Sequence, residues 1–184
     1  AAIMAATTQQ PDIVFLDLGL PDLDGVEIIR RIRTWSQMPI IVISARSEDF
    51  DKVTALDAGA DDYLTKPFSV TEMLARLRGA QRRISSPAAM TGDSVFRNGN
   101  LTIDYGAGCA FLNGQELKLT PTEYKLLCLL AKDAGKVLTH TYLTDKIWGS
   151  SWESDMASLR VHMATLRKKI EKDSDTQYIQ THIG

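Results

Sequence analysis

The sequence has few cysteines and no long apolar segment. Its two cysteines, Cys109 and Cys128, lie in no CxxC motif and near no cluster of histidines. A disulfide framework or a zinc site is therefore not indicated, and two reduced thiols in or near the core suit a cytosolic protein. No apolar run approaches the ~20 residues that span a membrane. The N-terminus also lacks the basic start and apolar centre of a signal peptide. We expect no membrane partner and a cytoplasmic location.

A strong charge of one sign is also missing. The formal net charge is −2, from 21 basic and 23 acidic residues. This balance does not mark the whole chain as a nucleic-acid binder. The apolar share of 44% and the charged share of 24% are those of an ordinary globular protein. The length of 184 residues suits one large domain or two small ones.

The N-terminal part of the chain alternates strand and helix patterns. The strand segments are short, β-branched and almost continuously apolar, which is typical of parallel strands buried on both faces. An alternating order of strands and helices predicts an α/β layered fold. We expect strands at 13–16, 40–44 and 63–65, and helices at 26–33, 50–58 and 71–84.

The C-terminal part follows a different pattern. Residues 85–93 (SSPAAMTGD) are rich in turn formers and predict a linker. Beyond them, Asn98-Gly99 and Asn113-Gly114 are hairpin dipeptides between short strands. Helices are expected at 122–132, 140–148 and 156–172, with a last strand at 178–181.

Three polar side chains follow successive strands of the expected parallel sheet. Asp17 ends the first strand, Ser44 ends the second and Lys66 follows the third. The carboxyl ends of parallel strands meet at one edge of a sheet, so these groups should converge. A carboxylate there could accept a phosphoryl group, and the hydroxyl and ammonium could hold its oxygens. Taken singly, Asp17 could cap a turn and Lys66 could be a surface lysine. A cis peptide at Lys66-Pro67 could aim the lysine inward.

The segments LDLGLPDLDG, VISAR and GADDYLTKPF resemble the receiver domain of response regulators. The resemblance implies a doubly wound, flavodoxin-like α/β fold over residues 1–84. It implies phosphorylation of Asp17 by a sensor histidine kinase, with Ser44, Tyr63 and Lys66 as switch residues. It also implies Mg²⁺ held by the Asp17 carboxylate and the Gly19 carbonyl.

Several parts of a complete receiver domain have no counterpart in this sequence. A complete receiver begins with a strand that ends in an acidic pair, and this domain is expected to lack its first two strands. In the strand order 2-1-3-4-5, that would leave the strand ending at Asp17 at an unpaired edge. Mg²⁺ binding should then be weak or absent. The C-terminus should likewise stop before the last strand of the wing, so both ends are expected to be truncated.

The expected helix at 156–172 has an apolar stripe and a basic face. Leu159, Met163, Leu166 and Ile170 form the stripe. This helix and the segment LTPTEYKLLCLLAKDAGKVLTHTYLTDKIWG resemble the winged-helix effector of OmpR/PhoB-type regulators, an α+β domain over residues 94–184. In the receiver half, the segments RIRTWSQMPIIVISARSED and DKVTALDAGADDYLTKPF resemble regulators of potassium-uptake genes.

The winged-helix resemblance implies binding to double-stranded promoter DNA and contact with RNA polymerase. A helix of this kind fits the major groove. Without the resemblance, the same residues would suit a solvated basic face. The loop 148–152 would either anchor the core or contact the polymerase; we assign Trp148 to the core and leave Trp152 open. We expect base contacts from Arg160, His162 and Thr165, phosphate contacts from Arg167, Lys168 and Lys169, and a backbone contact from His182.

The receiver resemblance implies a switching surface formed around the third expected strand and the helices on either side of it. The opposite charges on this surface suit a two-fold dimer between receivers. They could equally be solvated charges within one chain that contribute little. The expected pairs are Lys52 with Glu72, and Asp61 or Asp62 with Arg76 or Arg78.

These features predict a DNA-binding response regulator of a two-component system, not an enzyme, that controls transcription of genes such as those for potassium uptake. One alternative is a DNA-binding protein with a degenerate receiver that works without phosphorylation. Another is an aspartyl-phosphate phosphatase. Such an enzyme needs a second acid two residues after its nucleophile, where this chain has Gly19.

Overall fold

The structure is a computed structural model of the whole chain. It describes residues 2–19, 24–45, 47–81, 94–150, 152–172 and 175–182. The expected linker, 85–93, lies outside the described residues. We call residues 2–81 the N-terminal half and residues 94–182 the C-terminal half.

The N-terminal half is an α/β unit with a parallel sheet, as the sequence predicted. The sheet has the order β1-β2-β3, and its strands are Val14–Asp17, Ile40–Ser44 and Asp62–Thr65. The helices are α1 (Ala2–Gln9), α2 (Gly25–Arg33), α3 (Asp49–Asp57) and α4 (Val70–Gln81). Isoleucines spaced three to four residues apart on α2 pack with the buried side chains of β1 and β2.

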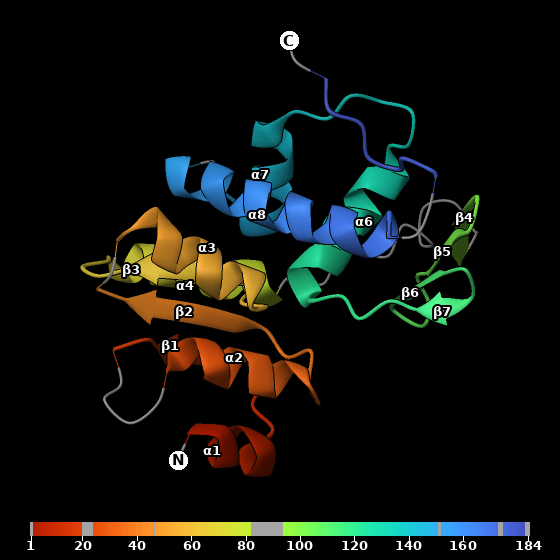
Figure 1. Cartoon of the computed structure of the whole chain (residues 1–184). Helices are drawn as coiled ribbons and strands as arrows, with labels where there is room; N and C mark the ends of the chain where they lie inside the picture. Colours follow the sequence, from red (N-terminus) through yellow and green to blue (C-terminus); the bar gives the residue numbers. More distant parts are fainter. Residues whose placement is uncertain are drawn as a thin grey trace.

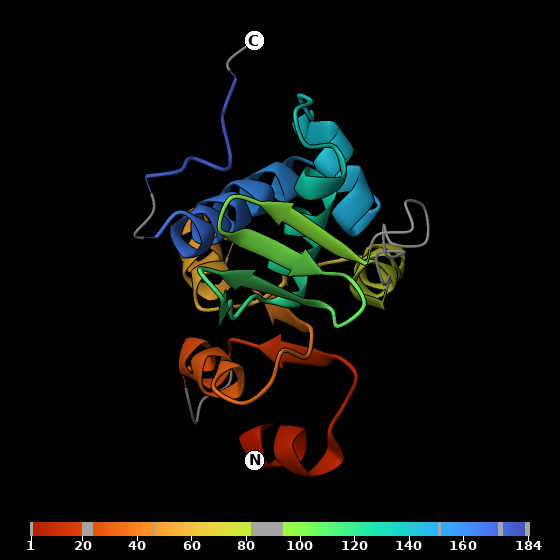
Figure 2. The same ribbon diagram turned by 90° about the vertical axis from the view of Figure 1, so that its right-hand side faces the viewer.

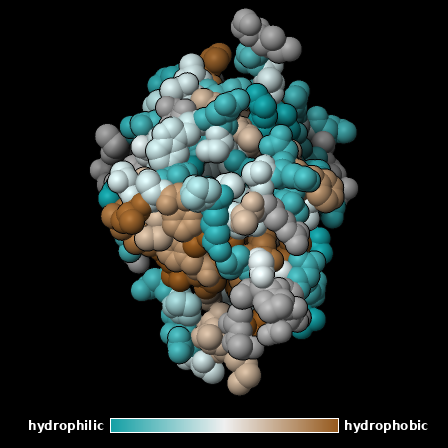
Figure 3. Space-filling model, turned by 90° about the vertical axis from the view of Figure 1, so that its left-hand side faces the viewer, coloured by the Kyte–Doolittle hydropathy of each residue, from teal (hydrophilic) through white to brown (hydrophobic). Residues whose placement is uncertain are grey.

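Strand β1 lies at one edge of this sheet, as expected from the sequence. It pairs with β2 alone among the described strands, and Phe15 is 40% exposed. On α4, Val70 and Leu74 are also exposed. Figure 3 shows apolar side chains gathered at about mid-height on one side of the molecule. Part of the apolar surface of this half is therefore left open to solvent.

The C-terminal half combines an antiparallel sheet with three helices. The sheet has the order β4-β5-β6-β7 (Figure 2). Asn113 and Gly114 both have positive φ in the two-residue turn between β6 and β7, as their hairpin motif predicted. The strands are Val95–Asn98, Leu101–Asp104, Cys109–Leu112 and Gln115–Glu116, and the helices are α6 (Pro121–Lys132), α7 (His140–Trp148) and α8 (Glu153–Ile170).

The long helix α8 supplies much of the core of the C-terminal half. Leu159, Leu166 and Ile170 are buried in one cluster with α6, α7 and the sheet, and Met163 packs against that cluster. The apolar stripe predicted for this helix is confirmed. The predicted strand at 178–181 is wrong: these residues form no strand in the described part of the chain, and only Ile179 among them is buried. Without a neighbouring strand, an apolar–polar alternation has no partner for its hydrogen bonds.

The two halves pack against each other through helices. Helix α8 lies along α3, and α7 lies against α4 (Figure 1). Gly79 permits the second approach, because a Cβ atom at this position would stand only 3.3 Å from the carbonyl oxygen of Trp148. Val161 of α8 packs against the core cluster of the N-terminal half. The helix expected to bind DNA therefore forms the side of the C-terminal half that packs against the N-terminal half.

We predict that Leu126→Ala lowers the free energy of unfolding by about 3 kcal/mol, because a buried leucine is replaced by a cavity. Leu126 is fully buried in the core of the C-terminal half. Urea unfolding followed by circular dichroism measures the change. Val137→Ala is the control, since Val137 is 71% exposed. Equal midpoints for the two variants would contradict this assignment of the core.

Candidate functional site

Asp17 and Lys66 meet at the carboxyl edge of the parallel sheet. Asp17 ends β1 and lies opposite Ile43, while Ser44 ends β2 opposite Thr65, the residue before Lys66. The Lys66 ammonium lies 2.5 Å from Asp17 Oδ2, and the Gly19 N–H donates to Oδ1 at 2.8 Å. The Lys66-Pro67 peptide is cis, as the sequence suggested. The register brings the three predicted groups to one edge of the sheet.

The carboxylate of Asp17 is ionised and accessible. The hydrogen bond from Lys66, and then the one from Gly19, hold the pKa of Asp17 below its ordinary value of 3.8. Its side chain is 38% exposed, so a phosphoryl donor can reach it from solvent. Ser44 at the end of β2 and Tyr63 within β3 are both buried, at 1% and 4% exposure. An ionised and exposed carboxylate in this position can act as a nucleophile toward a phosphoryl donor.

The described residues around Asp17 do not make a cage for a hard cation. Both oxygens of Asp17 already have a partner, one a lysine and the other a backbone N–H. No group of three or more His, Cys, Asp or Glu side chains that could hold a metal occurs in the described ranges. Mg²⁺ prefers several oxygen ligands in octahedral geometry. One carboxylate and the Gly19 carbonyl do not by themselves meet that need.

The predicted DNA-contacting residues of α8 divide into two groups. Arg160 and Lys168 are exposed, as is His182 near the C-terminus. Arg167 donates to the Thr181 hydroxyl at 2.7 Å and so ties α8 to the C-terminal segment. These residues leave a basic strip of α8 open to solvent.

The other group faces the N-terminal half. His162 is 1% exposed: its Nε2 lies 3.1 Å from the Asp61 carbonyl oxygen, and its ring stacks obliquely on Trp148. Burial lowers the pKa of His162, against the opposing effect of the Asp61 carboxylate. Thr165 is 9% exposed, and its hydroxyl donates within α8. Neither residue can reach a base while the halves are packed together, because α3 and the turn that follows it cover that side of α8.

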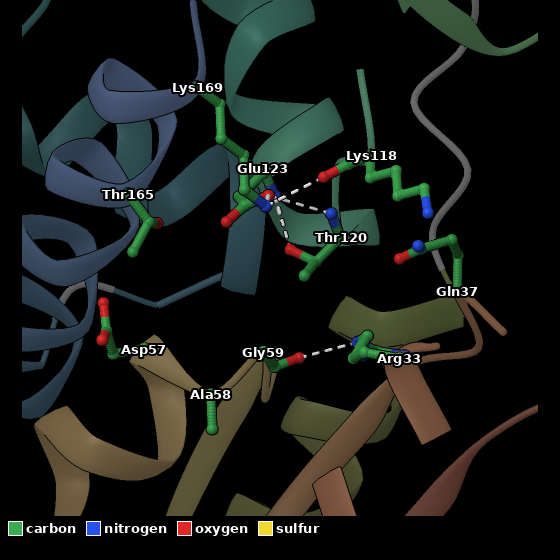
Figure 4. Close-up of a pocket in the computed structure, with 10 residues that line it drawn as sticks. All are labelled: Arg33, Gln37, Asp57, Ala58, Gly59, Lys118, Thr120, Glu123, Thr165 and Lys169. Carbon is green, nitrogen blue, oxygen red and sulfur yellow. Dashed lines mark hydrogen bonds and ion pairs between the residues drawn. The ribbon is translucent and has the colours of Figure 1, made fainter. Parts of the chain in front are cut away.

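Lys169 takes part in a polar cluster beside a cavity between the halves. Its ammonium binds Glu123 Oε2 at 2.5 Å and the Lys118 carbonyl oxygen at 2.9 Å (Figure 4). Glu123 in turn accepts from the Thr120 N–H, the capping residue of α6. The cavity has a volume of about 250 Å³, and the Arg33 guanidinium on its other side donates to the Gly59 carbonyl. Two of the three cationic residues that line it, Arg33 and Lys169, therefore already have partners within the chain.

The charges predicted for a dimer interface lie largely between the two halves of one chain. Asp61 Oδ1 accepts from the Thr122 N–H at 3.0 Å and from its hydroxyl at 2.9 Å, at the start of α6. Lys52 Nζ donates to the Ser154 carbonyl at 2.6 Å. Glu72 and Arg78 are partly or fully exposed. Lys52 and Asp61, which were predicted to contact a second chain, therefore contact the C-terminal half of their own chain in this structure.

Arg76 forms the most buried ionic contact of this surface. Its guanidinium lies 2.5 Å from Asp155 Oδ1 and 3.2 Å from Asp62 Oδ2, with side-chain exposures of 1 to 5%. Burial raises the pKa of Asp62 to about 6, and the charge of Arg76 opposes this shift only in part. The pairing of Arg76 with Asp62, expected across a dimer, occurs here within one chain. Arg76 on α4 and Asp62 on β3 lie close enough to pair within the N-terminal half, and α8 adds Asp155 as a closer partner.

Sequence reasoning named no role for Asp155 and no partner for Thr122, and it left the role of Trp152 open. Asp155 Oδ2 also accepts from the Trp152 N–H and the Ser150 hydroxyl, so it caps α8 while its other oxygen binds Arg76. The Trp152 ring lies 5.0 Å from the Arg76 guanidinium carbon. An acid at the third position of a helix was a visible capping signal, but nothing local named its partner 79 residues away. The core position predicted for Trp148 is confirmed.

Comparison with known proteins identifies the family. Residues 1–78 match the response regulator receiver domain, and residues 114–184 match the C-terminal domain of transcriptional regulatory proteins. The chain belongs to the OmpR/PhoB-type response regulators, the DNA-binding regulators of two-component systems. Receiver domains of this family generally bind Mg²⁺.

Individual relatives share most of the chain. The KDP operon transcriptional regulatory protein KdpE of Escherichia coli (strain K12) is 47% identical over 93% of this chain and 75% of its own length. The transcriptional regulatory protein KdpE of Mycobacterium tuberculosis (strain H37Rv) is 43% identical over 100% of this chain and 81% of its own length. A solved structure of a RitR mutant, 23% identical, covers 100% of this chain and 80% of its own with a TM-score of 0.72, which supports the fold. Among the helices that the structure describes, none has the length and apolar character to cross a membrane.

We predict that Lys66→Met raises the pKa of Asp17, because the strongest hydrogen bond to its ionised form is lost. In the unchanged chain, the stabilisation of folding by ionised Asp17 is present above pH 3.8 and is lost as the pH falls through the lower folded pKa. Titration of the carboxyl carbon by NMR measures the pKa directly. Lys118→Met, which removes an exposed lysine elsewhere, is the control and should leave this pKa unchanged. An unaltered titration in Lys66→Met would contradict the pairing.

Proposed function

We propose that the chain is the phosphorylation-controlled regulator of a potassium-uptake operon. The observation that carries the proposal is the contact between Lys66 and the exposed carboxylate of Asp17 at the edge of the sheet. A sensor histidine kinase would transfer a phosphoryl group to this carboxylate, and Lys66 would then bind the new oxygens. Identity of 43–47% to regulators named for the KDP operon supports the choice of target genes.

The switch would run through the two buried side chains below Asp17. The Ser44 hydroxyl would move toward the phosphoryl oxygens, and Tyr63 would follow it inward. The functional domains would be a receiver at 1–84, a linker at 85–93 and a winged helix at 94–184. The chain would act in the cytoplasm, where the kinase, promoter DNA and RNA polymerase are available.

The dimer would form through the receiver surface made by α3, β3 and α4. This surface would pair Lys52 with Glu72, and Asp61 or Asp62 with Arg76 or Arg78, each pair occurring twice about a two-fold axis. Two winged helices would then reach two half-sites on the promoter. Arg160, His162 and Thr165 would contact bases, and Arg167, Lys168, Lys169 and His182 would contact the DNA backbone.

A second candidate is a DNA-binding regulator whose receiver no longer needs phosphate. The poor fit of the described residues around Asp17 to a hard cation favours this alternative. The size-exclusion mass of the chain with and without beryllofluoride and Mg²⁺, which together mimic the phosphorylated aspartate, separates the two. A monomer-to-dimer shift that is lost in Asp17→Ala supports phosphorylation control. Promoter binding with no such shift supports the alternative.

We predict that Arg160→Ala weakens binding to a potassium-uptake promoter about tenfold, through loss of a base contact. Lys168→Ala should lower the affinity for promoter and unrelated DNA alike, and reduce the slope of log K against log salt by about 1. Fluorescence anisotropy at several salt concentrations measures both effects. Lys172→Ala, which removes a lysine past the end of α8, is the control. If all three variants bind equally, α8 is not the DNA-reading helix.

We predict that Glu72→Lys weakens receiver dimerisation and that Lys52→Glu in the same chain restores it. Reversal of one charge brings like charges together across the interface, and the second reversal re-forms the pair. Sedimentation equilibrium of the activated chain gives the dimer Kd. Glu48→Lys, an exposed acid just before α3, controls for net charge. Failure of the double variant to recover would place Lys52 and Glu72 away from each other in the dimer.

A further inference from the structure

The cavity between the two halves is lined by two charged side chains that have no partner among the described residues. The cavity has a volume of about 250 Å³ (Figure 4). Three of the charged residues that line it, Arg33, Glu123 and Lys169, are each held in an ion pair. The other two are Lys118 and Asp57, whose side chains make no hydrogen bond or ion pair within the described part of the chain. The unpaired charges are therefore one cation and one anion.

The hydrogen-bonding groups around the cavity are sorted by kind. Asp57 and Thr165 lie together on one side, and Lys118 and Gln37 lie on the opposite side (Figure 4). The first side offers acceptors, namely the Asp57 carboxylate and the Thr165 hydroxyl oxygen, whose own hydrogen is donated to a backbone carbonyl of α8. The second side offers donors, the Lys118 ammonium and the Gln37 amide. The cavity therefore has an acceptor end and a donor end.

A buried hydroxyl points to a ligand at the donor end. Thr120 lines the cavity and is 4% exposed, and its Oγ1 accepts from the Glu123 N–H at 3.3 Å. Among the described residues, no group accepts the hydrogen of this hydroxyl. A buried donor without an acceptor costs free energy, so such groups are usually paired. An anionic group between Thr120 and Lys118 accepts from both and removes this cost.

We propose that the cavity binds a small organic zwitterion, with a carboxylate at one end and an ammonium at the other. The carboxylate accepts from Lys118 and Thr120, and the ammonium donates to Asp57 and Thr165. The cavity has room for roughly eight groups of the size of water, at about 30 Å³ each, so the ligand has the size of an amino acid. The site is separate from Asp17, and the inference does not depend on phosphorylation.

Both ends of the site combine residues of the two halves. Asp57 ends α3 and Thr165 lies on α8, while Gln37 precedes β2 and Lys118 precedes α6. The complete site therefore exists only while the halves are packed together. A ligand that binds one arrangement stabilises that arrangement by mass action. The zwitterion is thus a second input, besides phosphorylation, to the packing of the halves.

The test measures the binding of 4-aminobutyrate to the full chain by NMR at constant ionic strength. The backbone amides of Ala58, Gly59 and Thr120 report occupancy of the cavity. Butyrate lacks the ammonium and butylamine lacks the carboxylate, so each probe keeps one charge of the zwitterion. The variants Asp57→Asn and Lys118→Gln each remove one charge of the site. Both side chains are exposed, so neither change disturbs the core.

We expect 4-aminobutyrate to bind with a Kd of about 1 mM, as suits a ligand of so few atoms. Butyrate and butylamine should bind about tenfold more weakly, because each loses one charged hydrogen bond. Asp57→Asn should weaken 4-aminobutyrate to a similar degree and leave butyrate unchanged. Lys118→Gln should weaken 4-aminobutyrate and butyrate and leave butylamine unchanged.

The matched controls are Asp145→Asn and Lys146→Gln, which remove an exposed acid and an exposed lysine of α7. Neither residue lines the cavity, so neither change should alter the binding of 4-aminobutyrate. An equal loss of affinity in the control and cavity variants would overturn the proposal, since it would show non-specific attraction between charges.

Two further results would also overturn the proposal. If 4-aminobutyrate shifts none of the three reporting amides, the cavity holds only water. If butyrate binds as tightly as 4-aminobutyrate, the Asp57 end takes no part and the ligand is not a zwitterion. Each of these results leaves the phosphorylation of Asp17 unaffected, because that carboxylate lies outside the cavity.

Discussion

The arrangement of the two halves depends on the buried carboxylate of Asp61. Oδ2 accepts from the Arg33 guanidinium at 2.8 Å and from the Ile40 N–H at 2.9 Å, which fixes the start of β2. Oδ1 accepts twice from Thr122 and so caps α6 of the other half. A carboxylate at 4% exposure is tolerated only because every lone pair finds a donor. The same side chain thus orders the parallel sheet and anchors the winged helix to it.

Around this anchor, charge rather than apolar area defines the contact between the halves. Arg76 binds a carboxylate of the C-terminal half, and Lys52 donates to a backbone carbonyl of that half. In the other direction, Lys125 of the C-terminal half donates to the Gly79 carbonyl at the end of α4. The large apolar clusters lie within each half, one around α2 and the sheet and the other around α6, α7 and α8. Each half can keep its own core when the halves separate, so movement between them need not unfold either.

Local patterns predicted the elements and the edge of the sheet that carries Asp17 well. Parallel strands align their carboxyl ends, so Asp17, Ser44 and Lys66 had to converge once the strands were placed. The stripe that includes Leu159 and Leu166 predicted the buried face of α8 because an α-helix repeats every 3.6 residues. The segment at 178–181 was predicted wrongly, since alternation marks a strand only where a neighbour accepts its hydrogen bonds.

Short-range periodicity and motifs within a few residues were enough to predict the class of the protein, the two folds, the place of Asp17 at the carboxyl edge of the sheet and the basic helix. The partners of the charged residues of α3, β3 and α4 became known from the packing of the two halves. Arg76 could pair with an acid of its own chain or of another, and opposite charges attract equally well in either arrangement. Asp155 becomes the partner because α8 packs against α3. That packing joins segments about 100 residues apart in the sequence, for example Lys52 and Ser154. No local pattern encodes such a contact, since it arises from the shapes of two finished surfaces.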